Sequence, residues 1–116
     1  MLAFALPAAA QVARNFPATA LRGTVVFGQP PEVSLNGQSA RLAPGARIRG
    51  ANNMLVLSGE LVGQRALVHY TLEPLGLVLD VWILSEEERA KRPWPTTPKQ
   101  AQAWAFDPVA QTWSVP

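Results

Sequence analysis

The stretch EVSLNGQSARL, residues 32–42, decides the fold class of the chain. At its centre is the pair Asn36-Gly37, which is preferred in a type I′ turn because both central residues of that turn need a positive φ angle. A two-residue loop fixes the strand register, so Glu32 is expected opposite Arg41 as an exposed ion pair worth under about 1 kcal/mol. The alternation of side chains gives one apolar face, made of Val33, Leu35, Ala40 and Leu42. The sequence therefore predicts an antiparallel hairpin with one buried face.

A second hairpin is expected between residues 66 and 84. Its turn is EPLG, residues 73–76, with proline where the φ angle is fixed and glycine where a left-handed φ closes the loop. Pairing the residues on the two sides of this turn puts Tyr70 opposite Asp80. The return strand, residues 77–84, is apolar on both faces except at Asp80, which is typical of a strand covered on both sides. The C-terminal region is the expected cover.

Three further stretches predict shorter strands. Residues 24–27 are β-branched and aromatic and predict the first strand. The pair Pro44-Gly45 is expected to break the chain, so residues 46–49 are expected to form a separate short strand. The apolar run MLVL, residues 54–57, predicts a buried strand.

The last third of the chain carries helix signals. Ser85 is followed three residues later by Glu88, which is the pattern of a capping box and predicts a helix start. The pair Thr97-Pro98 predicts a second short helix, because threonine caps a helix and proline is favoured at its first position. The residues after this helix predict a terminal hairpin or an extended tail.

Length and composition fit one small domain. The chain has 116 residues, of which 48% are hydrophobic and 16% charged, so it has ample apolar material for one core and no room for a second. Many short strands separated by glycine and proline favour a mostly β fold. We therefore expect one domain over residues 18–116, a small barrel of the SH3-like or OB type or a sandwich, with one or two short C-terminal helices and a Trp-rich segment.

The first 17 residues are interpreted as the remnant of a signal peptide followed by a flexible arm. Residues 2–10 are apolar, and Ala8 and Ala10 fit the small-x-small pattern that a signal peptidase accepts. A disordered Ala-rich arm is the alternative, because no charged segment precedes this run. The run is too short for a bilayer, which needs about 20 apolar residues, so a periplasmic or secreted location without a transmembrane span is expected.

Three arginines are candidate binding residues. Arg41, Arg47 and Arg49 are expected on strands and could form one basic face. Such a face suits an anionic partner, for example phosphate, a lipid headgroup or an acidic polysaccharide. The alternative is an ordinary solvated strand face.

Three tryptophans near the C-terminus are the other candidate binding residues. Trp94, Trp104 and Trp113 lie in a segment that is also rich in proline. Exposed, they would offer an aromatic surface to a protein or a glycan. The alternative is that they cover the open face of the barrel, since tryptophan buries a large area.

His69 and Asp80 are the residues considered for catalysis. His69 is the single histidine, and a histidine without an orienting partner is more often structural. Asp80 lies in an apolar strand and should have a hydrogen-bond partner there, for which Tyr70 is a candidate. The expected register places His69 opposite Val81 and on the other face from Asp80, so a small hydrolase using both residues is the least favoured hypothesis.

Several kinds of site are not indicated. The chain has no cysteine, which excludes disulfides, thiolate metal sites and cysteine nucleophiles. It contains no phosphate loop, dinucleotide fingerprint or zinc-protease motif, so no cofactor or metal is expected. The net charge of +2 is far below the charge of a nucleic-acid-binding surface, so nucleic acid is not an expected partner.

Three stretches of the chain resemble short exported bacterial proteins with no assigned activity. They are PGARIRG at residues 44–50, NMLVL at residues 53–57 and DVWIL at residues 80–84. The resemblance covers the middle half of the chain and implies a small exported β protein. It brings no functional residue with it.

The favoured function is that of a non-enzymatic exported binding module, either a monomer or a homodimer. Its partner would be another protein or a component of the cell envelope, held by the arginine face or by the tryptophan and proline surface. The alternative is a cell-envelope accessory protein that binds anionic lipid or glycan through the arginine face.

Overall fold

The hairpin at residues 32–42 forms as predicted. The computed structural model describes residues 13–116 and contains strands β2 (Glu32–Leu35) and β3 (Gln38–Arg49) as an antiparallel pair. Glu32 is opposite Arg41, and the turn residues Asn36 and Gly37 have φ angles of 53° and 82°. The two-residue loop therefore sets the register, as its turn chemistry requires.

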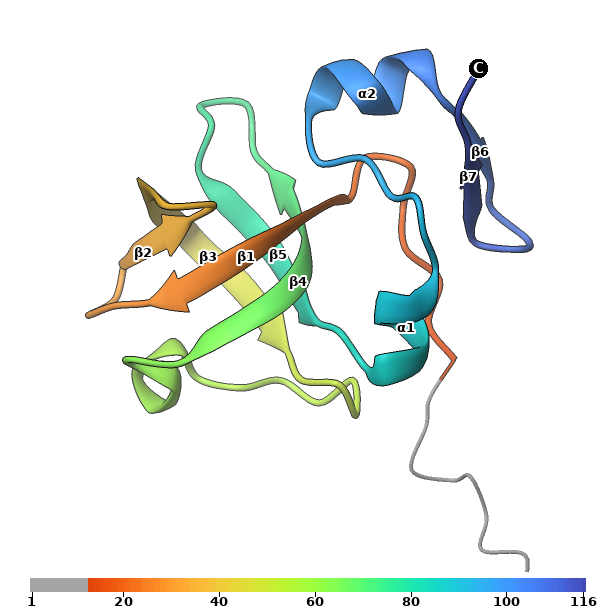
Figure 1. The fold of residues 1–116 in the computed structure, drawn as a ribbon. Coiled ribbons are helices and arrows are strands. Elements are labelled where there is room, and N and C mark those ends of the chain that lie inside the picture. The colour runs from red at the N-terminus through yellow and green to blue at the C-terminus, as the bar shows by residue number, and fades with distance from the viewer. Residues whose placement is uncertain (1–12) are drawn as a thin grey trace, which may run out of the picture.

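Five strands close into a barrel, which confirms the predicted fold class (Figure 1). The other three strands are β1 (Leu21–Phe27), β4 (Arg65–Leu72) and β5 (Val78–Ile83). The strand order is β1-β2-β3-β5-β4, with β1 and β4 paired to close the barrel and β3 parallel to β5. A five-stranded barrel with this crossover has the arrangement of the OB type.

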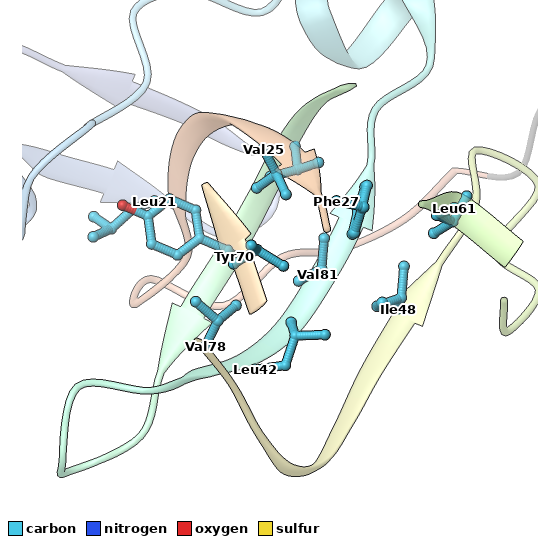
Figure 2. Close-up of a cluster of buried hydrophobic side chains, with 11 residues drawn as sticks. Leu21, Val25, Phe27, Leu42, Ile48, Leu61, Tyr70, Val78 and Val81 are labelled. Carbon is cyan, nitrogen blue, oxygen red and sulfur yellow. The ribbon is translucent and has the colours of Figure 1, made fainter. Parts of the chain in front are cut away.

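The barrel is filled mainly by aliphatic side chains, here called the barrel core (Figure 2). In β1 and β4 these side chains follow the period of two that a half-buried strand requires, as at Val25 and Phe27 and at Val68 and Tyr70. The apolar face expected for the first hairpin is part of this core. The buried members are Leu21, Val25, Phe27, Val33, Leu42, Ile48, Leu61, Val68, Tyr70, Val78 and Val81.

Strand β3 continues through Pro44-Gly45, so the expected break at this pair was wrong. The pairing of β3 with β5 shifts between Leu42 and Arg47, and Gly45 has a φ angle of 80°. Proline has no N–H to donate, and a glycine with positive φ lets the strand bulge and return to its partner. The two residues thus bend one strand instead of separating two strands.

The second hairpin has the expected turn but a different register beyond it. The backbone N–H of Glu73 donates to the carbonyl of Leu77, as predicted, whereas Tyr70 is opposite Val81 and not Asp80. One extra residue of β5 lies between the pairs Leu72–Val78 and Tyr70–Val81. The sequence of an apolar strand gives no signal for such a bulge, because the residues on both faces of the strand are apolar.

The connection between β3 and β4 departs from the prediction most clearly. Residues 54–57 were expected to form a buried strand, but they make a single isolated bridge, between Arg49 and Leu55. Met54, Leu55 and Leu57 are 66, 62 and 73% exposed. The 3-10 helix η2 (Ser58–Leu61) follows, and its Leu61 side chain is part of the barrel core.

The elements after the barrel follow their sequence signals. Helix α1 (Glu86–Ala90) begins with the predicted capping box, and α2 (Pro98–Ala103) begins with the predicted threonine cap. Strands β6 (Ala105–Asp107) and β7 (Thr112–Ser114) form the terminal hairpin. Among the described residues, neither helix has the length and apolar character to cross a bilayer.

Residues 13–20 and 84–114 pack together on one side of the barrel and are here called the outer layer (Figure 1). The expected cover for the return strand is therefore confirmed, because Trp94 and Trp113 form a second core with Leu84. Phe16 belongs to this core as well, although it lies in the segment interpreted as a flexible arm. The proposed signal-peptide pattern at residues 8–10 lies outside the described residues.

Candidate functional site

The three candidate arginines do not gather at one point. Arg41 pairs with Glu32, with 2.9 Å between Arg41 Nε and Glu32 Oε2, in the hairpin half of β3. Beyond the bulge, Arg47 pairs with Asp80, with 3.4 Å between Arg47 Nε and Asp80 Oδ1. Arg49 donates to the carbonyl of Asn53 at 3.1 Å. Each of the three guanidinium groups therefore has a different partner. This arrangement fits the alternative interpretation, in which these arginines belong to an ordinary solvated strand face.

The candidate tryptophans belong mainly to the interior of the outer layer. Trp94 and Trp113 are buried, and their ring centroids lie 6.0 Å apart. Trp104 is half-buried and packs against the same cluster. The alternative interpretation, that these residues cover the open face of the barrel, is the one that fits their burial.

His69 lies on β4 and is buried between the barrel and the outer layer. Its ring stacks on Trp94 with 4.1 Å between centroids, and only 1% of the residue is exposed. Arg22 donates from Nε and from Nη2 to His69 Nε2, each over 3.1 Å. Since arginine only donates, His69 Nε2 accepts, and the proton of the neutral ring is on Nδ1. Burial, with the charges of Arg22 and Arg14, lowers the pKa of His69 to about 2.

In the described part of the chain, Asp80 and His69 share no partner. The bulge in β5 turns Asp80 to the outside of the barrel, the side that His69 also faces, so the expected placement on opposite faces was wrong. Thr71 Oγ1 donates to Asp80 Oδ2 at 2.9 Å, and Arg47 forms an ion pair with the same carboxylate. Tyr70, the expected donor, lies in the barrel core instead. The contacts of the two residues do not assemble a catalytic pair.

A buried ion pair joins the first described residues to α1. Arg14 Nε donates to Glu88 Oε2 at 2.9 Å, and its other nitrogens donate to the carbonyls of Gly50 and Ile83. Burial opposes ionisation of Glu88, but hydrogen bonds from Arg14 and Ser85 outweigh it and lower the pKa of this carboxyl. Sequence reasoning missed Arg14 because the segment before residue 18 was set aside as an arm.

A small cavity lies beside this ion pair. Its volume is about 100 Å³, and its walls include Arg14, Phe16, His69, Lys91, Trp94 and Gln111. That volume is well above the roughly 10–15 Å³ that one water needs. Aromatic and charged side chains thus meet at one small hollow of the outer layer.

An apolar groove lies at the bulge of β3. Two hollows of about 300 and 330 Å³ are neighbours, with Pro31, Leu42 and Ala43 in the walls of both, and are together called the groove here. Leu57 lines the first hollow, and Arg41 lines the second. Proline and glycine residues at positions 30–31 and 44–45 line the groove, but the sequence pattern at Pro44-Gly45 predicted only a break between strands.

The described residues contain no group of three or more His, Asp or Glu side chains placed to hold a metal ion. A scan against protein-family models, a search of the curated proteins and a search of the solved structures each find no match to this chain.

Proposed function

We propose that this chain is a non-enzymatic binding module that holds an extended segment of another protein in the apolar groove at the bulge of β3. The observation that carries the proposal is the exposure of Met54, Leu55 and Leu57 next to this groove. Neighbouring exposed apolar side chains are a common mark of a protein-binding surface.

Charge selects the kind of partner segment. The groove walls contain one charged residue, Arg41, and no acidic residue. Arg47 lies on the same strand and is mostly exposed. An apolar side chain flanked by Asp or Glu therefore complements the groove better than a basic segment does.

The alternative of an envelope accessory that binds anionic lipid or glycan has less support. It needs the three arginines of β3 to converge on one anion. Arg41 and Arg47 lie on the two sides of the bulge and pair with different carboxylates, Glu32 and Asp80, so they do not converge on one point. Export to the periplasm or the outside of the cell stays part of the proposal, on the pattern at Ala8 and Ala10.

Selection from a displayed peptide library tests the proposed groove. The selected peptides should carry a large apolar residue beside acidic residues, and their affinity is measured by fluorescence anisotropy. Leu57→Asp should weaken binding by about tenfold or more, which is about 1.4 kcal/mol, because it removes apolar area and repels the acidic flank.

Val109→Asp is the matched control, since Val109 is also an exposed aliphatic residue but lies in the β6–β7 turn and lines neither hollow of the groove. It should leave the peptide affinity unchanged. Equal effects of the two substitutions, or selected peptides without acidic residues, would contradict the proposal. Circular dichroism of both variants checks that the barrel is intact.

A further inference from the structure

The backbone of Ala46 has no partner strand, although Ala46 belongs to β3. Within the described residues, no pairing of β3 with β2 or β5 includes Ala46, and no hydrogen bond of the loops involves its N–H or its carbonyl. The residue lies in the bulge, where β3 bends between Leu42 and Ile48 (Figure 2). An unpaired strand residue presents one donor and one acceptor to an extended chain beside it.

These two backbone groups face the groove. The carbonyl of Ile48 accepts a hydrogen bond from the N–H of Val56 over 2.8 Å, on the side of β3 that is away from β5. Alternate residues of a strand turn their backbone polar groups to the same side, so those of Ala46 face the same way as those of Ile48. Ala46, Ile48 and Val56 line the first hollow of the groove, together with Pro31.

The bulge is open to an approaching chain. Gly45 is exposed, and a Cβ atom placed on it would have no heavy atom within 4 Å. On this side of β3, backbone hydrogen bonds to other segments are made at Leu42 and at Ile48. The residues between them, 43–47, form a gap in the pairing that admits an added strand of at most about five residues.

We propose that the segment held in the groove adds a short β strand to β3 at Ala46. This mode of binding deepens the proposed function and rests on it. A backbone N–H of the partner donates to the carbonyl of Ala46, and the N–H of Ala46 donates to a backbone carbonyl of the partner. An extended segment has these groups free at every second residue, whereas a helix has already paired them internally. The partner is therefore an extended peptide and not a helix.

An added strand restricts the sequence of the partner. The partner residue that donates to Ala46 needs an N–H, which excludes proline at that position. Successive side chains of a strand point to opposite faces, so one face of the segment looks into the hollow between Leu42 and Val56, where an apolar side chain fits. Arg41 and Arg47 lie on the two sides of the bulge and are both mostly exposed, so acidic residues suit both ends of the segment.

Replacing single amides of the peptide by esters tests the backbone pairing. The peptide is the tightest binder from the displayed library, and each ester removes one N–H donor without adding bulk. We expect one central ester to weaken binding by about tenfold or more in fluorescence anisotropy, because a carbonyl in the groove loses its donor. Esters at the ends of the peptide, outside the added strand, are the controls and should change the affinity by less than about twofold. Equally small effects of all esters would overturn the inference, and the proposed function would stand because the peptide still binds.

Hydrogen exchange gives the matching measurement on the protein. The N–H of Ala46 should exchange rapidly in the free protein, and the bound peptide should slow its exchange by about tenfold or more, as measured by NMR. The N–H of Val115, which is exposed and outside the groove, is the control and should keep its rate. An Ala46 amide that the peptide leaves unprotected would overturn the inference. So would an amide that is already protected in the free protein, for example by a second copy of the chain. If the library yields no binding peptide, the proposed function fails, and the inference fails with it.

Discussion

The barrel core and the outer layer are both buried interiors, but different kinds of side chain fill them. Aliphatic side chains fill the barrel, and no charged side chain is among them. The outer layer contains Phe16, Trp94 and Trp113, and beside these rings it buries Arg22 and His69. Buried polar groups require defined partners, whereas aliphatic packing mainly requires the right volume. The barrel is therefore the structural scaffold. The outer layer is the region whose stability we expect to depend on pH, because it covers Arg22 and His69.

The largest expected effects on stability come from removing one large aromatic ring from each interior. Trp94→Ala deletes the ring that stacks on His69 and the hydrogen bond from Trp94 Nε1 to the carbonyl of Ala20. We expect it to lower the free energy of unfolding by about 3–5 kcal/mol, as Phe27→Ala should do in the barrel core. Urea unfolding followed by circular dichroism measures both losses.

A smaller loss in the Trp94→Ala variant would show that the outer layer and the barrel do not unfold together. If Trp94→Ala costs less than about 1 kcal/mol, or produces two unfolding transitions, the outer layer is not part of the same cooperative unit as the barrel. The slope of the unfolding free energy with urea concentration should also stay the same in the Phe27→Ala variant.

The second comparison is the response to pH. The unfolded chain takes up a proton at His69 near the usual pKa of about 6.5, whereas the folded state resists protonation down to about 2. The unfolded state therefore binds more protons in this range, and stability falls as the pH is lowered, by up to about 1.4 kcal/mol per pH unit. Below about 4.5, loss of the Glu88 charge adds to the decline, since the folded state holds the pKa of this group low.

Urea unfolding at several values between pH 7 and pH 5 measures this effect. The carboxylates contribute little in that range, and the chain has no other histidine. The His69→Gln variant should therefore show nearly constant stability there, even if its stability is lower throughout. A steep decline in this variant would place the pH sensitivity elsewhere.

The smallest expected effect is at the surface of the barrel. Glu32→Gln removes the exposed ion pair with Arg41 and should change the free energy of unfolding by less than about 1 kcal/mol, because water and salt screen the pair. A double-mutant cycle with Arg41→Gln measures the coupling. A coupling energy well above about 1 kcal/mol would contradict this expectation, because the exposed pair would then stabilise the fold as much as a buried polar contact of the outer layer does.

Local signals predicted the parts of the fold that depend on neighbouring residues. The Asn36-Gly37 turn gave the correct register of β2 and β3, because a two-residue loop leaves one pairing. The caps at Ser85 and Thr97 likewise gave the starts of both helices. In each case the deciding hydrogen bond joins residues that are close in the sequence.

The parts of the fold and of the site that were predicted wrongly or missed depend on contacts between residues that are far apart in the sequence. The run at residues 54–57 is apolar enough for a buried strand, but β3 already pairs with β2 and β5 in the closed barrel. The partnership of Arg22 with His69 spans 47 positions, and that of Arg14 with Glu88 spans 74. Their types and spacings in the sequence gave no indication of either contact, so the cavity was not predicted.

The amide of Gln111 also has a consequence for how the chain is made. Its Oε1 accepts from the backbone N–H of Phe16, and the two residues are 95 positions apart. At a synthesis rate of about 5–20 residues per second, this partner of Phe16 is produced roughly 5–20 s after Phe16 itself. The barrel strands are complete before that time. The hydrogen bond between Phe16 and Gln111 therefore forms after the barrel strands have been made, so the barrel can be in place before the outer layer is complete.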